Sequence, residues 1–293
     1  MQHLLIVESD IELYIPDYNF DGLAIIDWES WRPIYKTNWG KMRIYQHMSE
    51  EYVRRHFPNI QNKDEIKEKA EETFENAAKK LMSSTLKLAR RLRPKAKWGF
   101  YGFPSRIGGS HADISNTNKA YNKQLSWLYL ESTSLYPSIY LKSFSLSLTH
   151  SERNYYIYTM LKEAQRFSLD GKLPIYPFTK FLYDEYASNT TDQVYDQEDL
   201  CNSIRQSMDL GMSGIIFWGS SKMASSEAKC KVIADYLKNT LGPYTENVID
   251  EANKCARVRC SDEYRCFKDS KTRCWENMDF QNYKCQAPYV DVR

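Results

Sequence analysis

The chain has 293 residues, of which 40 are basic and 38 are acidic, and its formal net charge is +2. This near balance excludes the strongly basic surface typical of nucleic-acid-binding proteins, and the length suits one large α/β domain or a medium domain with a small appendage. Aromatic residues make up 14% of the chain, which indicates either a carbohydrate-lined groove or a tyrosine-rich core. No apolar stretch has the length of a transmembrane helix.

The first predicted strand carries the most informative feature of the sequence. Residues 22–26 form an apolar run that predicts a strand buried on both faces. Asp27 and Glu29 follow it, and side chains at positions i and i+2 of a strand point to the same side. We therefore expect two carboxyl groups at the carboxyl end of a strand, where parallel-sheet enzymes carry their catalytic residues.

The N-terminus of the sequence lacks the pattern of a signal peptide.

Helices and strands alternate along the rest of the chain. Apolar residues recur at helical spacing from Asn62 to Arg93, which predicts a long amphipathic helix that Pro94 ends. Three further helices are predicted, over residues 151–167, 198–210 and 225–241. Gly211 closes the second, and Gly242-Pro243 stops the third. Strands are predicted over residues 97–103, 135–141, 173–178 and 213–219, and a polar loop over residues 108–123. This alternation favours an α/β fold with a parallel sheet, specifically a barrel.

The cysteines divide the sequence. Five of the seven lie near the C-terminus, at positions 255, 260, 266, 274 and 285, which predicts a domain over residues 1–254 and a cysteine-rich tail over residues 255–293. Asn189 begins a glycosylation sequon, and both features indicate a secretory environment. Cys201 is expected to be a buried thiol. The odd number of tail cysteines leaves one free, or paired with Cys230 or Cys201. Neither the histidines nor the cysteines have metal-ligand spacing, so we expect no metal or cofactor.

The carboxyl pair has a functional and a structural interpretation. An Asp-x-Glu sequence alone usually marks a solvated face, but Asp27 and Glu29 follow a buried strand and have Trp28, Trp31 and Trp39 beside them. A carboxyl group near apolar rings and a second carboxyl group is favoured in its protonated form, as a general acid requires. The pair cannot straddle a sugar as the opposed carboxyl groups of ordinary glycosidases do. A substrate-assisted glycosidase mechanism fits this spacing better.

Four separated motifs resemble the animal hyaluronidase family in order and spacing. They are Asp27-Trp28-Glu29-Ser30-Trp31-Arg32-Pro33, Trp98-Gly99-Phe100-Tyr101, Tyr136-Pro137-Ser138-Ile139-Tyr140 and Phe217-Trp218-Gly219-Ser220-Ser221. The resemblance covers residues 3–254, and the tail resembles the EGF-like extension of some family members. It implies a distorted (β/α) TIM-like barrel that hydrolyses β-1,4 bonds after N-acetylhexosamine units of hyaluronan and, in some members, chondroitin. It also implies an extracellular or lysosomal location.

The same resemblance implies roles for individual residues. Glu29 matches the general acid, which protonates the leaving oxygen while the substrate's own acetamido oxygen attacks the anomeric carbon, and which then activates water. Asp27 matches the carboxyl group that shares a proton with Glu29 and steadies the cyclic intermediate. Tyr101 and Tyr140 match tyrosines that orient the acetamido group, and Trp218 matches a wall of the sugar pocket. The residues that match groove positions are Ser138, Ser220 and Ser221.

Other positions keep two interpretations. Arg32 either binds a substrate carboxylate or forms a structural ion pair. Tyr183, in Leu182-Tyr183-Asp184, either lines the groove or packs in the core. Trp31 and Trp39 are expected to pack the loop rather than to contact sugar.

Departures from the family pattern lead to a second functional hypothesis. Family members have a strand, a helix and a second strand ahead of the match to residue 3, so the strand before Asp27 is expected to expose an unpaired edge. Cys230 matches a cysteine that pairs with one in that segment, and Arg106 stands where another family cysteine would be. The alternatives to an active hydrolase are a truncated, catalytically inactive hyaluronidase-like protein that binds glycans or does not fold, and a chitinase-like barrel. The single Asp-x-Glu lacks the further upstream aspartate of the chitinase pattern.

Overall fold

The computed structural model describes residues 2–108, 113–141, 147–168, 171–184, 193–260, 265–274 and 279–287. The α-helices are α1 (Gln2–Tyr14), α2 (Arg43–His56), α3 (Lys63–Leu92), α4 (Asn116–Gln124), α5 (Ser126–Glu131), α6 (His150–Arg166), α7 (Gln197–Leu200), α8 (Gln206–Asp209), α9 (Glu227–Tyr236) and α10 (Gly242–Arg259). The strands are β1 (Leu23–Ile26), β2 (Lys97–Phe100), β3 (Phe178–Thr179), β4 (Ile216–Phe217), β5 (Arg265–Phe267) and β6 (Lys284–Gln286). The chain therefore has a helix-rich α/β fold. None of the described helices is long and apolar enough to cross a membrane.

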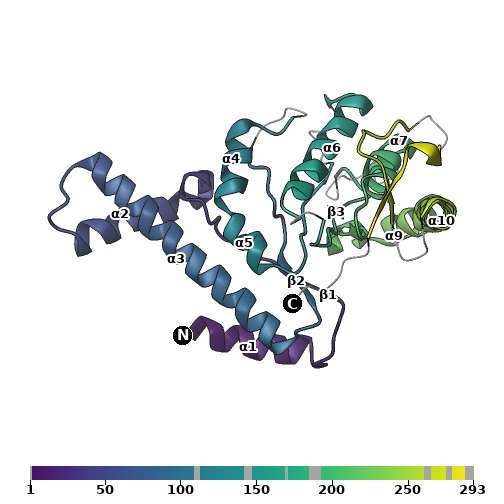
Figure 1. The fold of residues 1–293 in the computed structure, drawn as a ribbon. Helices are drawn as coiled ribbons and strands as arrows, with labels where there is room; N and C mark the ends of the chain where they lie inside the picture. Colours follow the sequence, from purple (N-terminus) through teal and green to yellow (C-terminus); the bar gives the residue numbers. More distant parts are fainter. Residues whose placement is uncertain are drawn as a thin grey trace. The chain divides into compact units, whose positions relative to one another are not determined.

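Short 3₁₀ and π segments complete the described elements. The 3₁₀ segments are η1 (Tyr35–Thr37), η2 (Gly40–Met42), η6 (Ser221–Ala224) and η8 (Phe280–Asn282). The π segments are η5 (Cys201–Arg205) and η7 (Leu237–Leu241). The elements, which Figure 1 labels along the ribbon, group into two compact units. Unit 1 comprises Met1–Tyr101 and Ala120–Ser134, and unit 2 comprises Gly102–Lys119 and Leu135–Arg293.

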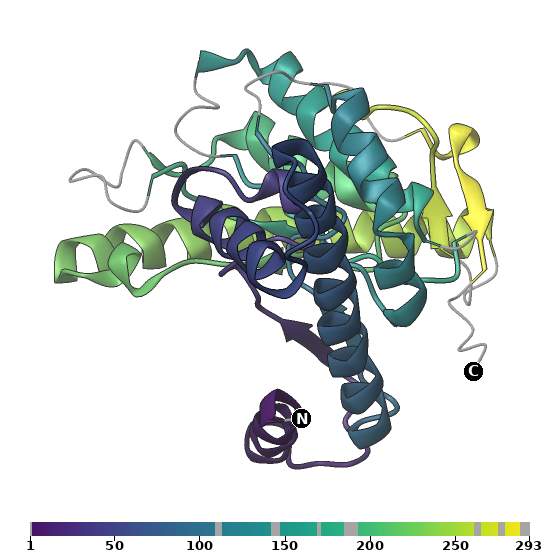
Figure 2. The ribbon, with the colours of Figure 1, turned by 90° about the vertical axis from the view of Figure 1, so that its left-hand side faces the viewer.

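Helix α3 is the helix of unit 1 against which α1, α2 and α5 pack. The sequence predicted its bounds within one residue. The side-chain oxygen of Asn62 caps its first turn by accepting the N–H of Asp64 at 2.8 Å. Its buried face includes Ala70 and Leu86, both fully buried. Helix α2 packs along α3 (Figure 2) and buries Val53 against it. This apolar contact, rather than helix propensity alone, stabilises the pair.

Strands β1 and β2 form a parallel pair in unit 1. Their register runs from Leu23 opposite Lys97 to Ile26 opposite Phe100. Ala24 and Phe100 are buried, as expected for the apolar run. Within the described residues β1 has β2 as its single strand neighbour, which is the unpaired edge that the sequence predicted.

Three parallel segments of unit 2 replace the longer strands that the sequence predicted. Strands β3 and β4 pair in parallel, and β-bridges join Leu135 to Ile175 and Ser138 to Phe178. The backbone N–H of Phe178 donates to the oxygen of Pro137, and that of Ile216 donates to the oxygen of Pro177. Segments 135–139, 175–179 and 213–217 therefore run side by side. They stay short because prolines interrupt two of them and cannot donate to a ladder.

One predicted loop and one predicted helix end were wrong. The polar loop expected over residues 108–123 contains the start of α4 at Asn116. Gly242-Pro243 does not stop the last predicted helix: α9, η7 and α10 follow one another without a break from Glu227 to Arg259. Pro243 lies in the first turn of α10, where the absence of a backbone N–H destabilises a helix little. The π segment η7 before it has the wider hydrogen-bond spacing of a π turn, which lets the helix continue into α10.

Three disulfides crosslink unit 2, joining Cys201 to Cys274, Cys255 to Cys266 and Cys260 to Cys285. Cys201 is buried, but the expectation of a free thiol was wrong, because residues 265–274 return over its helix and bring Cys274 to it. The alternative that a tail cysteine pairs with Cys201 is confirmed. Cys230 is exposed and has no disulfide.

A buried carboxylate also attaches this returning segment to helix α8. Asp209 is fully buried and forms an ion pair with Lys268, with 2.9 Å between the ammonium and the carboxylate oxygen. Thr272 and Tyr283 donate their hydroxyl protons to the same carboxylate. Burial, together with the charge of Asp209, raises the pKa of Tyr283. Arg205 Nε also lies 3.9 Å from this carboxylate, so the C-terminal residues add a closer ion pair and hydrogen bonds to a buried charge.

Candidate active site

In unit 1, candidate residues directly follow the two parallel strands. Asp27 comes after β1 and Tyr101 after β2, and the backbone N–H of Tyr101 donates to the oxygen of Ile26 at 3.0 Å. Asp27 and Glu29 are exposed, and within the described residues neither carboxylate has a hydrogen bond or ion pair. The sequence predicted apolar surroundings for these carboxyl groups, whereas both residues are exposed. The two acids have open access to solvent.

The loop after Glu29 is held by its own side chains. Arg32 donates from Nη1 to the oxygen of Thr37 at 2.5 Å, and its guanidinium lies 5.1 Å from the centroid of the Trp39 ring. Burial lowers the pKa of Arg32, and the nearby charge of Glu29 opposes this shift. Trp31 packs edge-on against Phe74, at 5.8 Å between ring centroids. These contacts agree with a loop-holding role for Arg32 and Trp31, whereas Trp39 remains 51% exposed.

In unit 2, a cation and two aromatic rings follow the three parallel segments. Tyr140 comes after residues 135–139, Lys180 after β3 and Trp218 after β4. The Tyr140 and Trp218 rings stack with centroids 6.3 Å apart and an angle of 25° between their planes. The ammonium of Lys180 lies 5.1 Å from the Tyr140 centroid and 4.8 Å from that of Trp218. We call these three residues the aromatic-cation cluster.

The cluster contains one residue that no sequence motif indicated. Tyr140 and Trp218 were both predicted, but Lys180 was not, because a lysine two positions after Phe178 carries no signal until the strands align. Trp218 is 44% exposed and Tyr140 only 7%. The tryptophan face is therefore the part of the cluster that a ligand can reach.

The predicted groove serines lie at the same strand ends. Ser138 is half-buried beside Phe178 in the parallel bridge. Ser220 caps the short segment η6, and its hydroxyl accepts the backbone N–H of Lys222 at 3.2 Å. Ser221 is exposed at the first position of η6. All three positions remain predicted sugar contacts.

Tyr183 is buried, and its contacts agree with the packing interpretation. Its hydroxyl donates to the carboxylate of Asp199, and its ring lies 4.7 Å from that of Tyr195 between centroids. Asp199 is fully buried and also pairs with Arg153 at 2.9 Å. Burial and the bond to Asp199 raise the pKa of Tyr183. The predicted glycosylation site Asn189 lies outside the described residues.

A family model described as hyaluronidase, of glycoside hydrolase family 56, matches residues 1–287. The chain belongs to the hyaluronidase family. Among curated relatives, a Crotalus adamanteus hyaluronidase is 34% identical over 282 residues, which cover 91% of this chain and 60% of the relative. Hyaluronidase-3 of Homo sapiens is 37% identical over 254 residues, covering 84% and 60%. Hyaluronidase PH-20 of Rattus norvegicus is 34% identical over 279 residues, covering 92% and 53%. The chain thus spans between half and two thirds of the length of these relatives.

Solved structures of bee venom hyaluronidase resemble this chain. One has a TM-score of 0.73 at 33% identity and covers 83% of this chain and 77% of the bee protein. A second, solved in complex with a hyaluronic acid tetramer, has a TM-score of 0.76 at 33% identity and covers 84% and 76%. These values extend the family relationship from sequence to fold.

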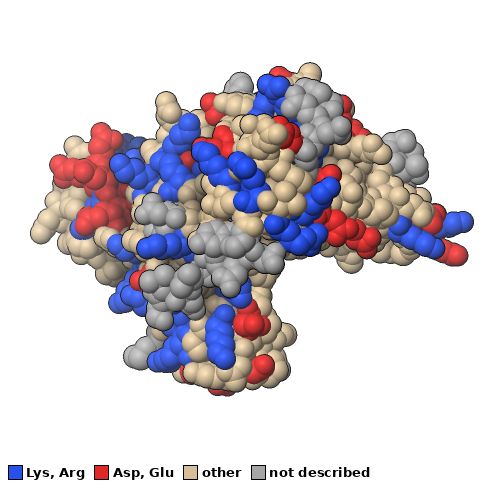
Figure 3. Space-filling view, turned by 45° about the vertical axis from the view of Figure 1, so that its right-hand side comes forward, with Lys and Arg blue, Asp and Glu red and all other residues tan. Residues whose placement is uncertain are grey.

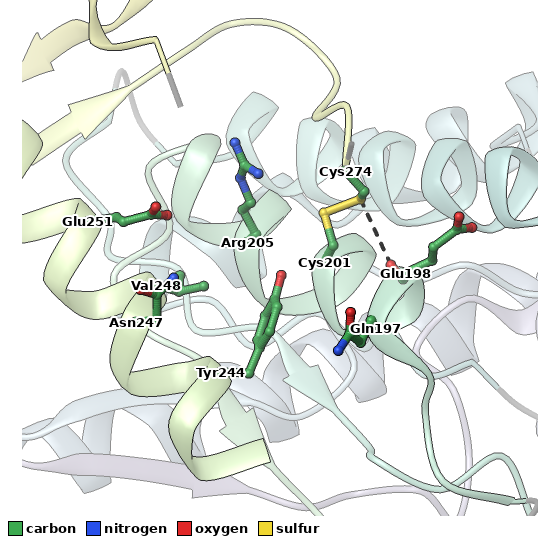
Figure 4. Close-up of a pocket in the computed structure, with 9 residues that line it drawn as sticks. All are labelled: Gln197, Glu198, Cys201, Arg205, Tyr244, Asn247, Val248, Glu251 and Cys274. Atoms are coloured by element: carbon green, nitrogen blue, oxygen red, sulfur yellow. Dashed lines mark hydrogen bonds between the residues drawn. A yellow bond between two sulfur atoms is a disulfide. The ribbon is translucent and has the colours of Figure 1, made fainter. Parts of the chain in front are cut away.

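A pocket of this hyaluronidase-family chain lies away from the aromatic-cation cluster, between the η5 region and α10 (Figure 4). Its volume is about 240 Å³, and the Cys201–Cys274 disulfide forms part of its wall. Arg205 and Glu251 place opposite charges in its lining, and burial raises the pKa of the lining residue Tyr244 to about 12. None of the predicted site residues lines this pocket. We therefore do not assign the predicted sugar site to this pocket.

A histidine and several carboxylates meet at the start of α6 and α7. His150 contacts Asp196 through Nε2 at 2.7 Å and Glu198 through Nδ1 at 3.0 Å. Asp199 lies close enough to complete a three-ligand geometry with His150 and Asp196, but its carboxylate already binds Arg153 and Tyr183. We interpret the cluster as an ion-pair link between the start of α6 and the start of α7.

On the face shown in Figure 3, acidic and basic side chains are interspersed, in line with the balanced composition.

Proposed function

We propose that the chain is an endo-β-N-acetylhexosaminidase that hydrolyses β-1,4 bonds of hyaluronan, and of chondroitin as a second substrate. Membership of the hyaluronidase family supports the reaction class. The bee venom relative, which was solved with a hyaluronic acid tetramer, supports the polymer. The observation that carries the proposal is the position of Asp27 and Glu29 directly after β1, beside Tyr101 at the end of β2. Carboxyl ends of parallel strands are where such folds hold catalytic groups.

The proposed mechanism assigns a separate role to each carboxyl group. Glu29 protonates the leaving oxygen, so that the bond to the anomeric carbon breaks as the acetamido oxygen of the substrate attacks that carbon. Asp27 stabilises the positive charge of the cyclic intermediate. Glu29 then takes a proton from water as the water oxygen attacks the anomeric carbon, and the bond from that carbon to the acetamido oxygen breaks. Tyr101 and Tyr140 orient the acetamido group, and Trp218 offers its exposed face to the sugar ring. The serines 138, 220 and 221 donate hydrogen bonds to sugar hydroxyls.

The remaining sequence predictions belong to the same proposal. They are a distorted (β/α) barrel over residues 1–254 and an EGF-like segment over residues 255–293, both carried by the family resemblance. The three disulfides support an oxidising location, which we propose to be extracellular or lysosomal.

Product release tests the proposal. The full chain is expressed in a secretory host, and hyaluronan and chondroitin are incubated with wild type and Glu29→Gln across acidic to neutral pH. Even-numbered oligosaccharides from wild type, and none from the variant, would support the hydrolase. A folded wild type without products would contradict it.

One observation favours a second candidate, a glycan-binding protein without hydrolase activity. Within the described residues β1 has a single strand neighbour, so the strand that leads to Asp27 and Glu29 is supported from one side. A catalytic pair needs placement within about 0.5 Å. Hyaluronan binding by a wild type that releases no product would favour this candidate.

A further inference from the structure

The pocket between the η5 region and α10 lies wholly within unit 2, and we call it the α10 pocket (Figure 4). Its volume of about 240 Å³ is several times the roughly 30 Å³ that one water molecule occupies in the liquid. The pocket therefore has room for a small organic molecule. None of the residues assigned to hydrolysis lines it, so its lining has no role in the proposed function.

Helix α10 turns one face toward this pocket. Its lining residues Tyr244, Asn247, Val248 and Glu251 are spaced by three, four and seven positions, which places them on the same side of a helix. Val248 is buried and, with the neighbouring disulfide, gives the pocket an apolar wall. Among the described residues, the side chains of Tyr244, Asn247 and Glu251 have no hydrogen-bond or ion-pair partner. Three polar groups therefore face the pocket with their bonding capacity unused.

Glu251 differs from the other charged residues of the lining. Glu198 contacts Nδ1 of His150 at 3.0 Å, and Nε of Arg205 lies 3.9 Å from the carboxylate of Asp209. Glu251 is half-buried and has no such contact within the described part of the chain. A carboxylate that is partly withdrawn from water and unpaired attracts a cation.

We propose that the α10 pocket binds a small organic compound through its primary ammonium group. An ammonium group has three N–H donors and no acceptor. The carboxylate of Glu251 accepts one of these bonds, and the side-chain oxygens of Tyr244 and Asn247 accept the others. The hydrocarbon part of the ligand then lies against Val248 and the Cys201–Cys274 disulfide.

The state of Tyr244 suits this role. Its side chain extends from α10 toward the Cys201–Cys274 disulfide (Figure 4). Burial raises the pKa of Tyr244 to about 12, so the phenol is neutral at physiological pH and keeps a lone pair for an N–H donor. A neutral hydroxyl group beside one carboxylate favours a cation over an anion.

A metal ion fits the same residues less well. Calcium takes about six to eight oxygen ligands, several of them usually carboxylates. The α10 pocket offers the carboxylate of Glu251 together with neutral oxygens, since Glu198 already contacts His150. A monovalent ammonium group needs only one negative charge.

Binding of three probes of equal length tests the inference. Butylammonium, butanoate and 1-butanol share a hydrocarbon chain and differ in charge. Each is titrated, with NMR detection, against the full chain and against Glu251→Gln, Tyr244→Phe and Glu246→Gln at neutral pH. Glu246 is an exposed carboxylate of the same helix that does not line the pocket, so its variant matches the change in net charge. Thermal unfolding shows whether each variant is folded.

We expect wild type to bind butylammonium with a dissociation constant on the order of 1 mM, as suits so small a ligand, and butanoate and butanol much more weakly. Glu251→Gln weakens the binding of butylammonium about tenfold, as loss of a charged hydrogen bond does. Tyr244→Phe weakens it about threefold, and Glu246→Gln changes it by less than about twofold because an exposed charge is screened.

Three results would overturn the inference. They are the absence of butylammonium binding to wild type, equal affinity for the three probes, and equal effects of Glu251→Gln and Glu246→Gln. The last result would mean that the probe associates with surface carboxylates in general. Because the test measures binding to residues outside the proposed hydrolase site, its outcome is independent of product release from hyaluronan.

Discussion

The two units present opposite chemistry at the ends of their parallel strands. In unit 1, Asp27, Glu29 and Tyr101 follow β1 and β2, and the two acids are exposed and unpaired within the described residues. In unit 2, the corresponding positions carry Tyr140, Lys180 and Trp218, which contact one another. Proton transfer needs accessible acids, whereas binding a long polyanion needs a fixed surface with a positive charge. Under the proposed function, this comparison places proton transfer in unit 1 and ligand binding in unit 2.

The units also differ in how their backbone is stabilised. All disulfides among the described residues lie in unit 2, whereas α2 and α3 stabilise unit 1 by apolar packing. The surface proposed to bind the ligand is thus on the covalently crosslinked unit. The carboxyl pair is on the unit that depends on helix contacts.

The strongest test of this division is Glu29→Gln. We expect hydrolysis of hyaluronan to fall by a factor of about 10³, because a general acid contributes between about 10² and 10⁴, while hyaluronan affinity stays within about twofold. Initial rates and calorimetric binding measure the two quantities. Glu12→Gln, at an exposed position of α1, is the matched control. A variant that lost affinity as well as rate would place recognition in unit 1 too.

Removal of a crosslink tests the difference in stabilisation. The double variant Cys201→Ala, Cys274→Ala is expected to lower the free energy of unfolding by about 2–4 kcal/mol, because its 73-residue separation leaves a large loop free in the unfolded chain. Cys230→Ser, at the exposed unpaired cysteine, changes it by less than about 0.5 kcal/mol. Denaturant unfolding followed by fluorescence gives both values. Equal effects would mean that the disulfide adds nothing to unit 2.

Trp218→Ala tests recognition by the ring. We expect KM for hyaluronan to rise about tenfold with a smaller change in kcat, because a stacking face is lost without loss of an acid. Trp39→Ala, a similarly exposed tryptophan in unit 1, serves as the control and leaves KM within about twofold. If Trp39→Ala raised KM as much, the assignment of recognition to unit 2 would be wrong.

The smallest expected effect concerns pH and the link between α6 and α7. Burial raises the pKa of Asp196, but hydrogen bonds from His150 and the backbone of Asp199 outweigh it, so the pKa lies below the usual 3.8. A lowered pKa stabilises the fold above that usual value and loses this effect as pH falls through the folded-state pKa. Asp196→Asn should retain the helix cap and lower the free energy of unfolding by less than about 1 kcal/mol at neutral pH, since the site is half-exposed.

Unfolding experiments from neutral pH down to acid check this sign. The difference between wild type and Asp196→Asn is expected to shrink as the pH drops below 3.8. A difference that grew on acidification would show that the ion pair with His150 does not stabilise the folded state.

The sequence predicted the elements whose ends are set by capping residues and prolines. The remaining features depend on tertiary contacts, which the sequence alone does not show. Asn62 and Pro94 mark the ends of α3 by capping and by loss of an N–H, both of which are readable from sequence. The helix end predicted at Gly242-Pro243 was wrong because this dipeptide occurs both at the end of one helix and in the first turn of the next. The π turn that joins α9 to α10 has no sequence signature. Asp27 and Glu29 were found because they follow an apolar run. Lys180 was not, because its neighbours Tyr140 and Trp218 are close only in space.

The buried carboxylate of Asp209 couples positions that are far apart in the chain. It contacts the ammonium of Lys268 and the hydroxyl groups of Thr272 and Tyr283, with Arg205 farther away at 3.9 Å, and loss of partners for a buried charge is unfavourable. Substitution at one of these positions is therefore tolerated only with substitution at another. In an alignment of relatives, position 209 should covary with positions 268 and 283. Substitutions in helix α8 and in this part of the tail should therefore occur together.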